Sequence, residues 1–319
     1  MALEDLRELR VVALAGGVGG AKMAHGLAQV LPAEHLTVIA NVGDDFELYG
    51  LTICPDLDTV MYTLAGMAND ETGWGIRGDT FQCLDRLAAL DAHAWFRLGD
   101  RDLATHLART RWLWEVASLT EATRRLCAAC GVVQQLLPAT DDMLRTIVET
   151  DAGDLEFQDY FVRRKCEPVV RGFHFRGLDA ALPTREALAA LEAADCVIVC
   201  PSNPFVSIAP ILALPGVRER VAAKPSAAVT PIIGGAAVKG PAAKMMRELG
   251  REPSAREAAR EYAGVVRGFL LDALDSNQTA AIEALGMRVQ LADTLMRDSD
   301  QRRALALEAL RLAVDCATA

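Results

Sequence analysis

The sequence predicts an α/β protein with a Rossmann-like, mainly parallel sheet flanked by helices and a smaller α+β insert. An apolar run at residues 10–15 leads into a glycine-rich turn and then into apolar positions at helical spacing. Short apolar runs typical of buried parallel strands recur at residues 36–40, 196–200, 227–230 and 269–271. Polar or glycine-rich segments follow these runs, as at the ligand-binding edge of an open α/β sheet. We expect one domain over residues 1–319, with the mixed insert at about 132–175.

The first expected unit is β-α-β and contains a glycine-rich turn. Four glycines, Gly16, Gly17, Gly19 and Gly20, surround Val18 and precede Lys22. They allow the backbone to turn tightly and to approach a ligand closely. A helix is expected over residues 21–31, because Met23, Leu27, Val30 and Leu31 are spaced for one face and Pro32 ends it. N–H groups at such a helix N-terminus bind anions.

The turn matches neither common phosphate-binding motif. GxGxxG requires a glycine where Lys22 stands, and the P-loop pattern requires a glycine at Ala21 and Ser or Thr at Met23. Close packing of a strand against a helix is the alternative explanation. Four glycines exceed what packing requires, so we expect ligand contact.

Four carboxylates follow the second expected strand. Asp44 and Asp45 belong to the segment NVGDD, and Asp56 and Asp58 to PDLDT. One or two carboxylates beside substrate phosphates are a typical Mg²⁺ site. Asp58 and Thr59 are also placed to cap a helix beginning near Val60.

The next region adds charged residues after a further expected strand. Residues 74–77 are expected to form a loop, Asp79 to cap a helix ending at Leu90, and residues 95–98 to form a strand before a helix over 103–112. Arg101 is placed either to bind an anionic ligand or to pair with Asp100 or Asp102. His25 and His106 are expected to be packing residues, and the sequence offers no nucleophile–His–acid set for acyl transfer.

The second half returns to an α/β pattern after the insert. A helix is expected over 118–130, and short alternating segments over 132–170 predict β-hairpins or a mixed insert. The basic, aromatic segment 158–165 is either an exposed hairpin face or a contact with an anionic or ring-bearing ligand or with a partner subunit. Ser202 and Asn203 follow the strand at 196–200 and offer donors at its end. Lys239 and Lys244 flank the start of a helix whose first turn is expected to hold Pro241. Ser254 is expected to cap the next helix, and a helix over 304–314 follows.

Composition excludes several classes of protein. The formal net charge of -10 argues against a nucleic-acid-binding surface. The eight cysteines are spread along the chain, so reduced, buried thiols and a cytoplasmic location are expected. Cys127 and Cys130 form a lone CxxC that is better explained as a helix end before Gly131 than as a zinc site. No apolar run approaches the roughly 18–20 residues of a membrane span, so no membrane association is expected.

Nine ordered segments resemble the 2-phospho-L-lactate transferase family of coenzyme F420 biosynthesis. They are GGVGGAK, NVGDD, ICPDLDT, GWGIRGDT, RLGDRDLATH, LLPATDD, FQDYFVRR, PSNPFVSIAPIL and TPIIGGAAVKGPAAKMM, and they span residues 11–246. The resemblance implies a Mg²⁺-dependent, Rossmann-like transferase, typically a homodimer. Such an enzyme joins a phosphorylated three-carbon acid from a GDP-linked donor to the deazaflavin Fo and releases GMP.

The resemblance also implies roles for individual residues. Asp58 and Arg101 would contact Fo, with Asp58 orienting or deprotonating its ribityl hydroxyl, and Asp45 would bind the metal with Asp44 and Asp56 as further candidates. The glycine turn with Val18 and Lys22 would hold the donor together with Ser202, Asn203, Gly234, Gly235 and Lys239.

Two other functions are considered. A related branch of the superfamily comprises non-catalytic regulators that bind sugar nucleotides, with a GGGTG-type loop and a PPGDIR-type segment. GGVGG and CPDLDT at these places favour the transferase. A dinucleotide-dependent oxidoreductase is disfavoured by the failed GxGxxG match and by Asn41 at the place of a ribose-binding acid. The donor's acid, phospholactate, phosphoenolpyruvate or phosphoglycerate, is left open.

Overall fold

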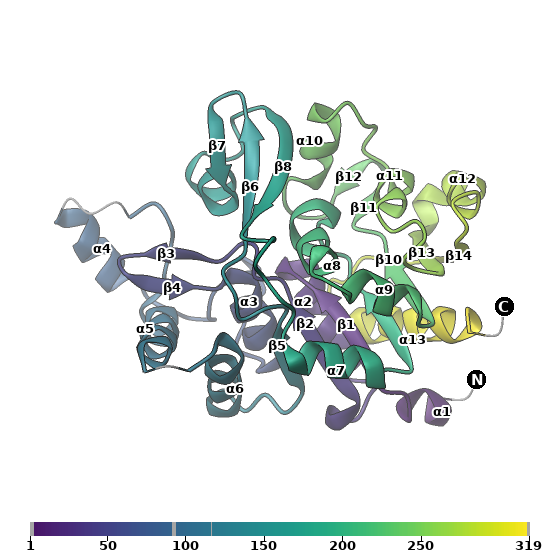
Figure 1. Ribbon diagram of the computed structural model, residues 1–319, viewed down its shortest axis with the longest axis horizontal. Coiled ribbons are helices and arrows are strands. Elements are labelled where there is room, and N and C mark those ends of the chain that lie inside the picture. Colours follow the sequence, from purple (N-terminus) through teal and green to yellow (C-terminus); the bar gives the residue numbers. More distant parts are fainter. Residues whose placement is uncertain (1–2, 91–93, 116, 318–319) are drawn as a thin grey trace.

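The protein is built on one seven-stranded parallel sheet. A computed structural model describes residues 3–90, 94–115 and 117–317 (Figure 1). The strand order is β14-β13-β10-β9-β1-β2-β5, and every pairing is parallel. The strands are β1 Val11–Ala15, β2 Leu36–Ala40, β5 Gln135–Pro138, β9 Cys196–Val199, β10 Ser226–Val229, β13 Gly268–Asp272 and β14 Arg288–Ala292. The expected Rossmann-like sheet is therefore confirmed, and β14 was missed.

The sheet changes direction between β1 and β9. From β1 the chain adds β2 and β5 on one side, whereas β10, β13 and β14 extend from β9 on the other. Leu14 lies opposite both Ile39 and Val199, so the three strands end at the same edge. Parallel sheets bind ligands at such a switch point, and here it lies beside the glycine turn and Ser202.

Helices cover both faces of the sheet. Since right-handed crossovers are the rule and strands are added in opposite directions, α2 and α9 lie on opposite faces. α2 packs against α3 and α13, while α9 packs against α7 and α8. The helices are α1 Leu3–Arg7, α2 Gly17–Ala28, α3 Pro55–Leu64, α4 Gln82–Ala89, α5 Asp100–Trp114, α6 Leu119–Ala129, α7 Arg185–Ala193, α8 Ala209–Ala213, α9 Val217–Ala222, α10 Ala242–Glu248, α11 Ala255–Arg260, α12 Thr279–Glu283 and α13 Ser299–Asp315.

A separate three-stranded antiparallel sheet forms the insert. Its strands are β6 Arg145–Thr150, β7 Gly153–Glu156 and β8 Val170–Arg176, and it projects beyond the main sheet at the top of Figure 1. A π-helical turn, Asp159–Arg163, connects β7 to β8. The expected insert is present, but its first residues belong elsewhere, because β5 pairs with β2 in the main sheet.

Two short hairpins complete the strands. β3 Phe46–Leu48 pairs with β4 Leu51–Ile53 between the two acidic segments NVGDD and PDLDT. β11 Ile232–Ile233 pairs with β12 Ala236–Ala237 across Gly234 and Gly235, whose φ angles of 57° and 75° suit a tight two-residue turn.

The prediction of a strand at residues 95–98 is wrong. This segment has no regular secondary structure, and its rings pack against the β3–β4 hairpin, with Phe46 5.5 Å from Trp95 and 4.9 Å from Phe96 between centroids. Leu98 is buried and Trp95 and Phe96 are half-buried, so the segment packs against a hairpin rather than in a sheet.

Several helix boundaries also differ from expectation. α3 begins at Pro55, so Asp58 lies within its first turn and does not cap a helix at Val60. Asp79 does not cap α4: it accepts from the N–H groups of Arg101 and Asp102 in α5. Asp100 in turn accepts from Gln82 and Cys83 at the start of α4. Pro241 precedes α10, whereas Ser254 caps α11 as expected.

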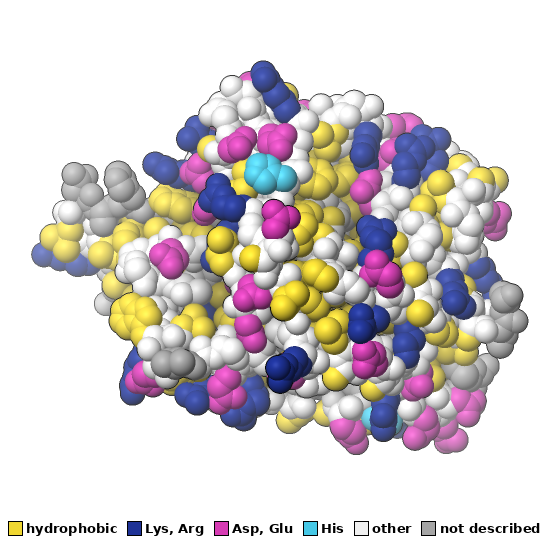
Figure 2. Space-filling view, in the orientation of Figure 1, with side chains coloured by type: hydrophobic (Ala, Val, Ile, Leu, Met, Phe, Trp, Pro, Cys, Tyr) yellow, Lys and Arg dark blue, Asp and Glu magenta, His cyan; other side chains and the backbone are white. Residues whose placement is uncertain are grey.

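The surface in Figure 2 carries acidic and basic side chains interspersed, and on this face the described residues form no concentrated basic patch. Within the described part of the chain, no helix is long and apolar enough to cross a membrane.

Candidate active site

The glycine turn is hydrogen-bonded to, and packs closely against, the loop after β9. α2 begins at Gly17, so the turn is also the first turn of the helix. Ser202 Oγ accepts from the Gly16 N–H at 3.1 Å and donates to the Gly16 carbonyl at 2.8 Å. A Cβ on Gly19 would lie 2.2 Å from the Pro201 carbonyl oxygen, so only glycine permits this approach. The turn and Ser202 thus form one rigid edge.

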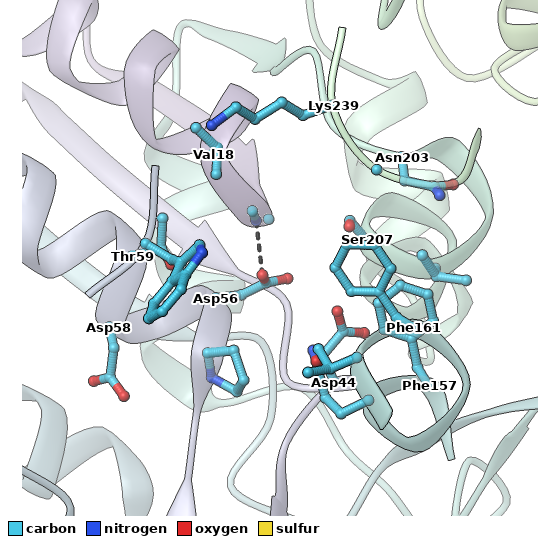
Figure 3. Close-up of a pocket in the computed structure, with 18 of the residues that line it drawn as sticks. Val18, Asp44, Asp56, Asp58, Thr59, Phe157, Phe161, Asn203, Ser207 and Lys239 are labelled. Atoms are coloured by element: carbon cyan, nitrogen blue, oxygen red, sulfur yellow. Dashed lines mark hydrogen bonds between the residues drawn. The ribbon is translucent and has the colours of Figure 1, made fainter. Parts of the chain in front are cut away.

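A cavity of about 620 Å³ opens at this edge of the sheet (Figure 3). Its walls come from the glycine turn, the loops after β2 and β9, the N-terminus of α3, α5 and the insert. The polar lining includes Asp44, Asp56, Asp58, Thr59, Tyr62, Asp102, His106, Gln158, Ser202, Asn203, Ser207 and Lys239. Segments more than 200 residues apart in sequence therefore share one site.

Two carboxylates of the predicted metal set face the cavity. Asn41 Nδ2 donates to Asp56 at 2.9 Å and to Asp44 at 3.2 Å, so the two acids lie close together. Figure 3 shows both acids at the cavity. Asp56 also accepts from the Gly17 N–H at 2.7 Å. Burial raises the pKa of Asp56 to about 6, and burial together with the Asp56 charge raises the pKa of Asp44 well above its usual range. This crowding of buried negative charge would be relieved by a cation.

Asp45, the adjacent acid, is placed differently from these two carboxylates. It is buried and does not belong to the cavity lining among the described residues. Its Oδ1 atom has no hydrogen-bond partner in the described structure, and burial raises its pKa to about 7. The sequence named Asp45 as the first metal candidate, whereas it is the neighbouring Asp44 that lines the cavity.

Asp58 lines the cavity and is paired with a residue that the sequence did not indicate. Arg109 of α5 donates to both Asp58 oxygens, by Nη2 to Oδ1 and by Nη1 to Oδ2 at 3.1 Å. His106 lies one turn earlier in α5, with Nδ1 3.6 Å from Asp58 and Nε2 3.3 Å from Asp102. The expectation that His106 is a half-buried packing residue is wrong, because it is buried among charged groups.

Asp102 is stabilised as an anion despite its burial. Burial opposes ionisation, but His106, the Tyr62 hydroxyl and Arg109 together lower the pKa of Asp102. Tyr62 donates to Asp102 at 2.7 Å. Arg109 was missed because its only sequence signal is helical spacing from Asp102 and His106.

Aromatic side chains form the apolar walls. Trp74, Trp95 and Phe96 lie on one part of the lining, and Phe157 and Phe161 of the insert lie on another. The rings of Phe157 and Phe161 are stacked 5.5 Å apart. Segment 158–165 therefore reaches the cavity through Gln158, Phe161 and Val162, while Arg163 and Arg164 pair with Asp159. The segment is therefore more than an exposed hairpin face, because part of it forms a wall of the cavity.

A smaller hollow of about 90 Å³ adjoins the cavity across Val18 and Gly19. Lys22 and Lys239 line it, together with Asn203, Thr230 and Thr294. Lys22 donates to the Met296 carbonyl at 2.9 Å and Lys239 to that of Thr72 at 3.0 Å. Burial is the main cause that lowers the pKa of Lys22, and the positive charges of Arg302 and Lys239 lower it further.

Three predicted ligand-contacting residues lie elsewhere. Arg101 is exposed, and Gly234 and Gly235 form the turn of the β11–β12 hairpin. Among the described residues that line the two hollows, none of these three is present. Gly20 serves packing, because a Cβ there would lie 2.7 Å from Ser202 Oγ.

Comparison with known proteins identifies the family. The family model described as 2-phospho-L-lactate transferase CofD matches residues 11–311. The chain belongs to this family. A phosphoenolpyruvate transferase of Streptomyces griseus is 42% identical over 313 residues, covering 96% of this chain and 98% of the relative. A 2-phospho-L-lactate transferase of Methanosarcina acetivorans is 41% identical over 296 residues, covering 93% and 96%.

A solved structure shares the fold of this CofD family member. A UPF0052 family protein from Bacillus halodurans aligns with a TM-score of 0.63 at 14% identity, covering 95% of this chain and 99% of that one. At this identity the likeness concerns the fold alone. The resemblance to the transferase family is confirmed, and the chain is a transferase by family.

Proposed function

We propose that the protein transfers a phosphorylated three-carbon acid from a GDP-linked donor to the ribityl hydroxyl of Fo, releasing GMP, in coenzyme F420 biosynthesis. The observation that carries the proposal is the single cavity in which a helix N-terminus, paired carboxylates and aromatic walls meet. Phosphoryl transfer to an alcohol requires in-line positioning and neutralised phosphate charge more than a covalent catalyst. The absence of a nucleophile–His–acid set from the sequence agrees with this.

The donor is assigned to the glycine turn and its neighbours. N–H groups at the start of α2 favour an anion. The Gly17 N–H already donates to Asp56, so Val18 and Gly19 at the cavity wall are the candidates for phosphate contact. Asn203 and Lys239 border both hollows, and Lys22 borders the smaller one, which places cationic and polar groups along one path for the donor.

Asp44 and Asp56 fit a Mg²⁺ site. No group of three or more His, Cys, Asp or Glu side chains in the described part of the chain is arranged to hold a metal. Mg²⁺ takes one or two carboxylates plus phosphate oxygens and water, so the pair suits a metal that is completed by the donor. Bound there, the ion would neutralise charge on the donor's phosphates. Asp45 would support this loop from behind.

The acceptor Fo is assigned to the Asp58 side of the cavity. Asp58 offers carboxylate oxygens to a hydroxyl, and Trp74, Trp95 and Phe96 offer faces and edges to a flat tricycle. Arg101 would reach Fo only by a change of conformation, because it lies outside the lining.

The family resemblance further implies a homodimer. Light scattering of the purified protein would test this oligomeric state.

Incubation with Fo, Mg²⁺ and a GDP-linked donor tests the proposal through release of GMP and formation of the phosphodiester product. We expect both products in equal amounts. Binding of the donor without GMP release would instead support the non-catalytic regulator.

The donor's acid needs a separate measurement. The phosphoenolpyruvate transferase and the 2-phospho-L-lactate transferase are almost equally identical to this chain, at 42% and 41%. Competition between phospholactyl, phosphoenolpyruvyl and phosphoglyceryl donors in one reaction gives the ratio of their kcat/KM values directly.

A further inference from the structure

We propose that Arg109 is a positioning residue that fixes the carboxylate of Asp58 for hydrogen bonding to the acceptor. The inference rests on the proposed function, because it concerns how the same cavity holds the acceptor hydroxyl. Arg109 does not itself line the cavity among the described residues, whereas Asp58 does.

The two side chains come from different helices and meet at the cavity wall. Asp58 lies in the first turn of α3 and Arg109 in the third turn of α5. The guanidinium engages both carboxylate oxygens, and the side chains are 1% and 6% exposed for Arg109 and Asp58. A bidentate pair of this kind fixes the carboxylate plane as well as its position.

Neighbouring groups hold the guanidinium in turn. Arg109 Nη1 lies 3.2 Å from His106 Nδ1, and it also reaches the Thr52 carbonyl at 3.4 Å. Because arginine only donates, His106 Nδ1 is the acceptor of this contact. His106 Nε2 lies 3.3 Å from Asp102 and makes no hydrogen bond in the described structure. The result is a chain of contacts, from Asp58 through Arg109 and His106 to Asp102, between α3 and α5.

Fold stability alone gives a poor account of this pair. A buried ion pair often stabilises less than apolar side chains of similar volume, because both charges lose their hydration. Here Arg109 Nε also lacks a hydrogen-bond partner in the described structure. A costly pair whose carboxylate faces a cavity is better explained by what that carboxylate binds.

The geometry assigns Asp58 the role of a fixed acceptor. Each Asp58 oxygen uses one lone-pair direction for Arg109 and retains another. A hydroxyl of the acceptor can donate to the remaining direction and be held in line with the donor phosphate. Arg109 acts through Asp58, so its removal should affect the acceptor and leave the donor unaffected.

The test is a double-mutant cycle with Arg109→Lys, Asp58→Asn and the double variant. Lysine keeps the positive charge but loses the two-pronged geometry. The matched control is Arg111→Lys, two residues along α5, where the side chain is 73% exposed and pairs with Glu115. KM and kcat for Fo, and the dissociation constant of GDP as the donor-side probe, are measured on variants shown to be folded by circular dichroism. Arg109→Gln replaces Arg109→Lys in the cycle if the lysine variant does not fold.

We expect Arg109→Lys and Asp58→Asn each to weaken kcat/KM for Fo by about tenfold or more, with GDP affinity within about twofold of wild type. The double variant should be no worse than Asp58→Asn alone, because both changes remove one function. Arg111→Lys should match wild type.

Three results would overturn the inference alone: unchanged kinetics toward Fo in the Arg109 variant, an equal loss of GDP affinity, or multiplied losses in the double variant. A wild-type protein that neither binds Fo nor releases GMP would overturn the proposed function and this inference with it. Measurements on the wild-type protein therefore distinguish a failure of the proposed function from a failure of the Arg109 inference alone.

Discussion

At the scale of single residues, the site depends on which of two adjacent acids faces the cavity. Asp44 and Asp56 share the amide of Asn41 and line the wall, whereas Asp45 is turned away with an unpartnered oxygen. Adjacent residues in a loop point in different directions, so sequence spacing does not decide between them. An experiment can therefore distinguish a metal held by Asp44 and Asp56 from a metal held by Asp45.

We predict that Asp56→Asn lowers Mg²⁺-dependent GMP release by about 100-fold or more, because a charge beside the donor phosphates is lost. The asparagine oxygen can still accept from the Gly17 N–H, while the hydrogen bond from Asn41 is lost, so circular dichroism of the variant checks that the fold persists. Steady-state kinetics over a Mg²⁺ titration measure the effect. Asp45→Asn is the control and should lose much less activity. A larger loss in Asp45→Asn than in Asp56→Asn would indicate that Asp45 binds the metal.

At the scale of elements, α2 is held by two backbone contacts that exclude side chains. A Cβ on Gly19 would lie 2.2 Å from the Pro201 carbonyl oxygen at the cavity, and one on Gly26 would lie 2.2 Å from the Arg302 carbonyl oxygen in α13. The same clash therefore exists at both ends of one helix, but only one end borders the site. Substitutions at Gly19 and Gly26 can therefore distinguish the effect of α2 packing from the effect of α2 on ligand binding.

We predict that Gly19→Ala and Gly26→Ala each lower the free energy of unfolding by about 1–3 kcal/mol, the usual cost of overpacking. Only Gly19→Ala should also raise KM for the donor, because it pushes the α2 N-terminus away from Pro201. Denaturant unfolding and donor kinetics per folded enzyme measure the two effects. Equal donor KM values in the two variants would argue against phosphate binding at this turn.

At the scale of the whole molecule, one cavity is assembled from both halves of the sheet and from the insert. The acids come from the β2 side, Ser202 from the β9 side and Phe157 from the insert. Folding therefore gathers buried negative charge that the unfolded chain disperses. Stability should depend on whatever neutralises that charge, whether a proton or a metal ion.

The pKa of Asp56 gives the sign of this dependence. Its folded value of about 6 exceeds the ordinary value of 3.8, so the folded state binds more protons between these values. We predict that Asp56 makes the metal-free protein more stable as pH falls from about 7 toward 5, and that Mg²⁺ stabilises it more at pH 7 than at pH 5. Thermal unfolding with and without Mg²⁺ measures both. Asp56→Asn should remove this component, and an unchanged pH dependence would contradict it.

Much of the fold follows from local sequence. β1, the glycine turn and α2 are predictable because an apolar run, four glycines and a 3.6-residue period act within 20 residues. β9, β10 and β13 are predictable because each is a short apolar run typical of a buried parallel strand. The strand predicted at residues 95–98 is wrong because a short apolar run does not distinguish a strand from rings packed on the β3–β4 hairpin.

The sequence by itself determined the family, the sheet edge that carries the candidate site and the segment, residues 41–59, that contains Asp44, Asp56 and Asp58. Only the tertiary structure decided that Asp44 and not Asp45 faces the cavity, that Arg109 holds Asp58, and that Phe161 of the insert forms a wall. The physical reason is separation along the chain: Asp58 and Arg109 lie 51 residues apart. Their contact depends on how α5 packs beside α3, which no local pattern in either helix specifies.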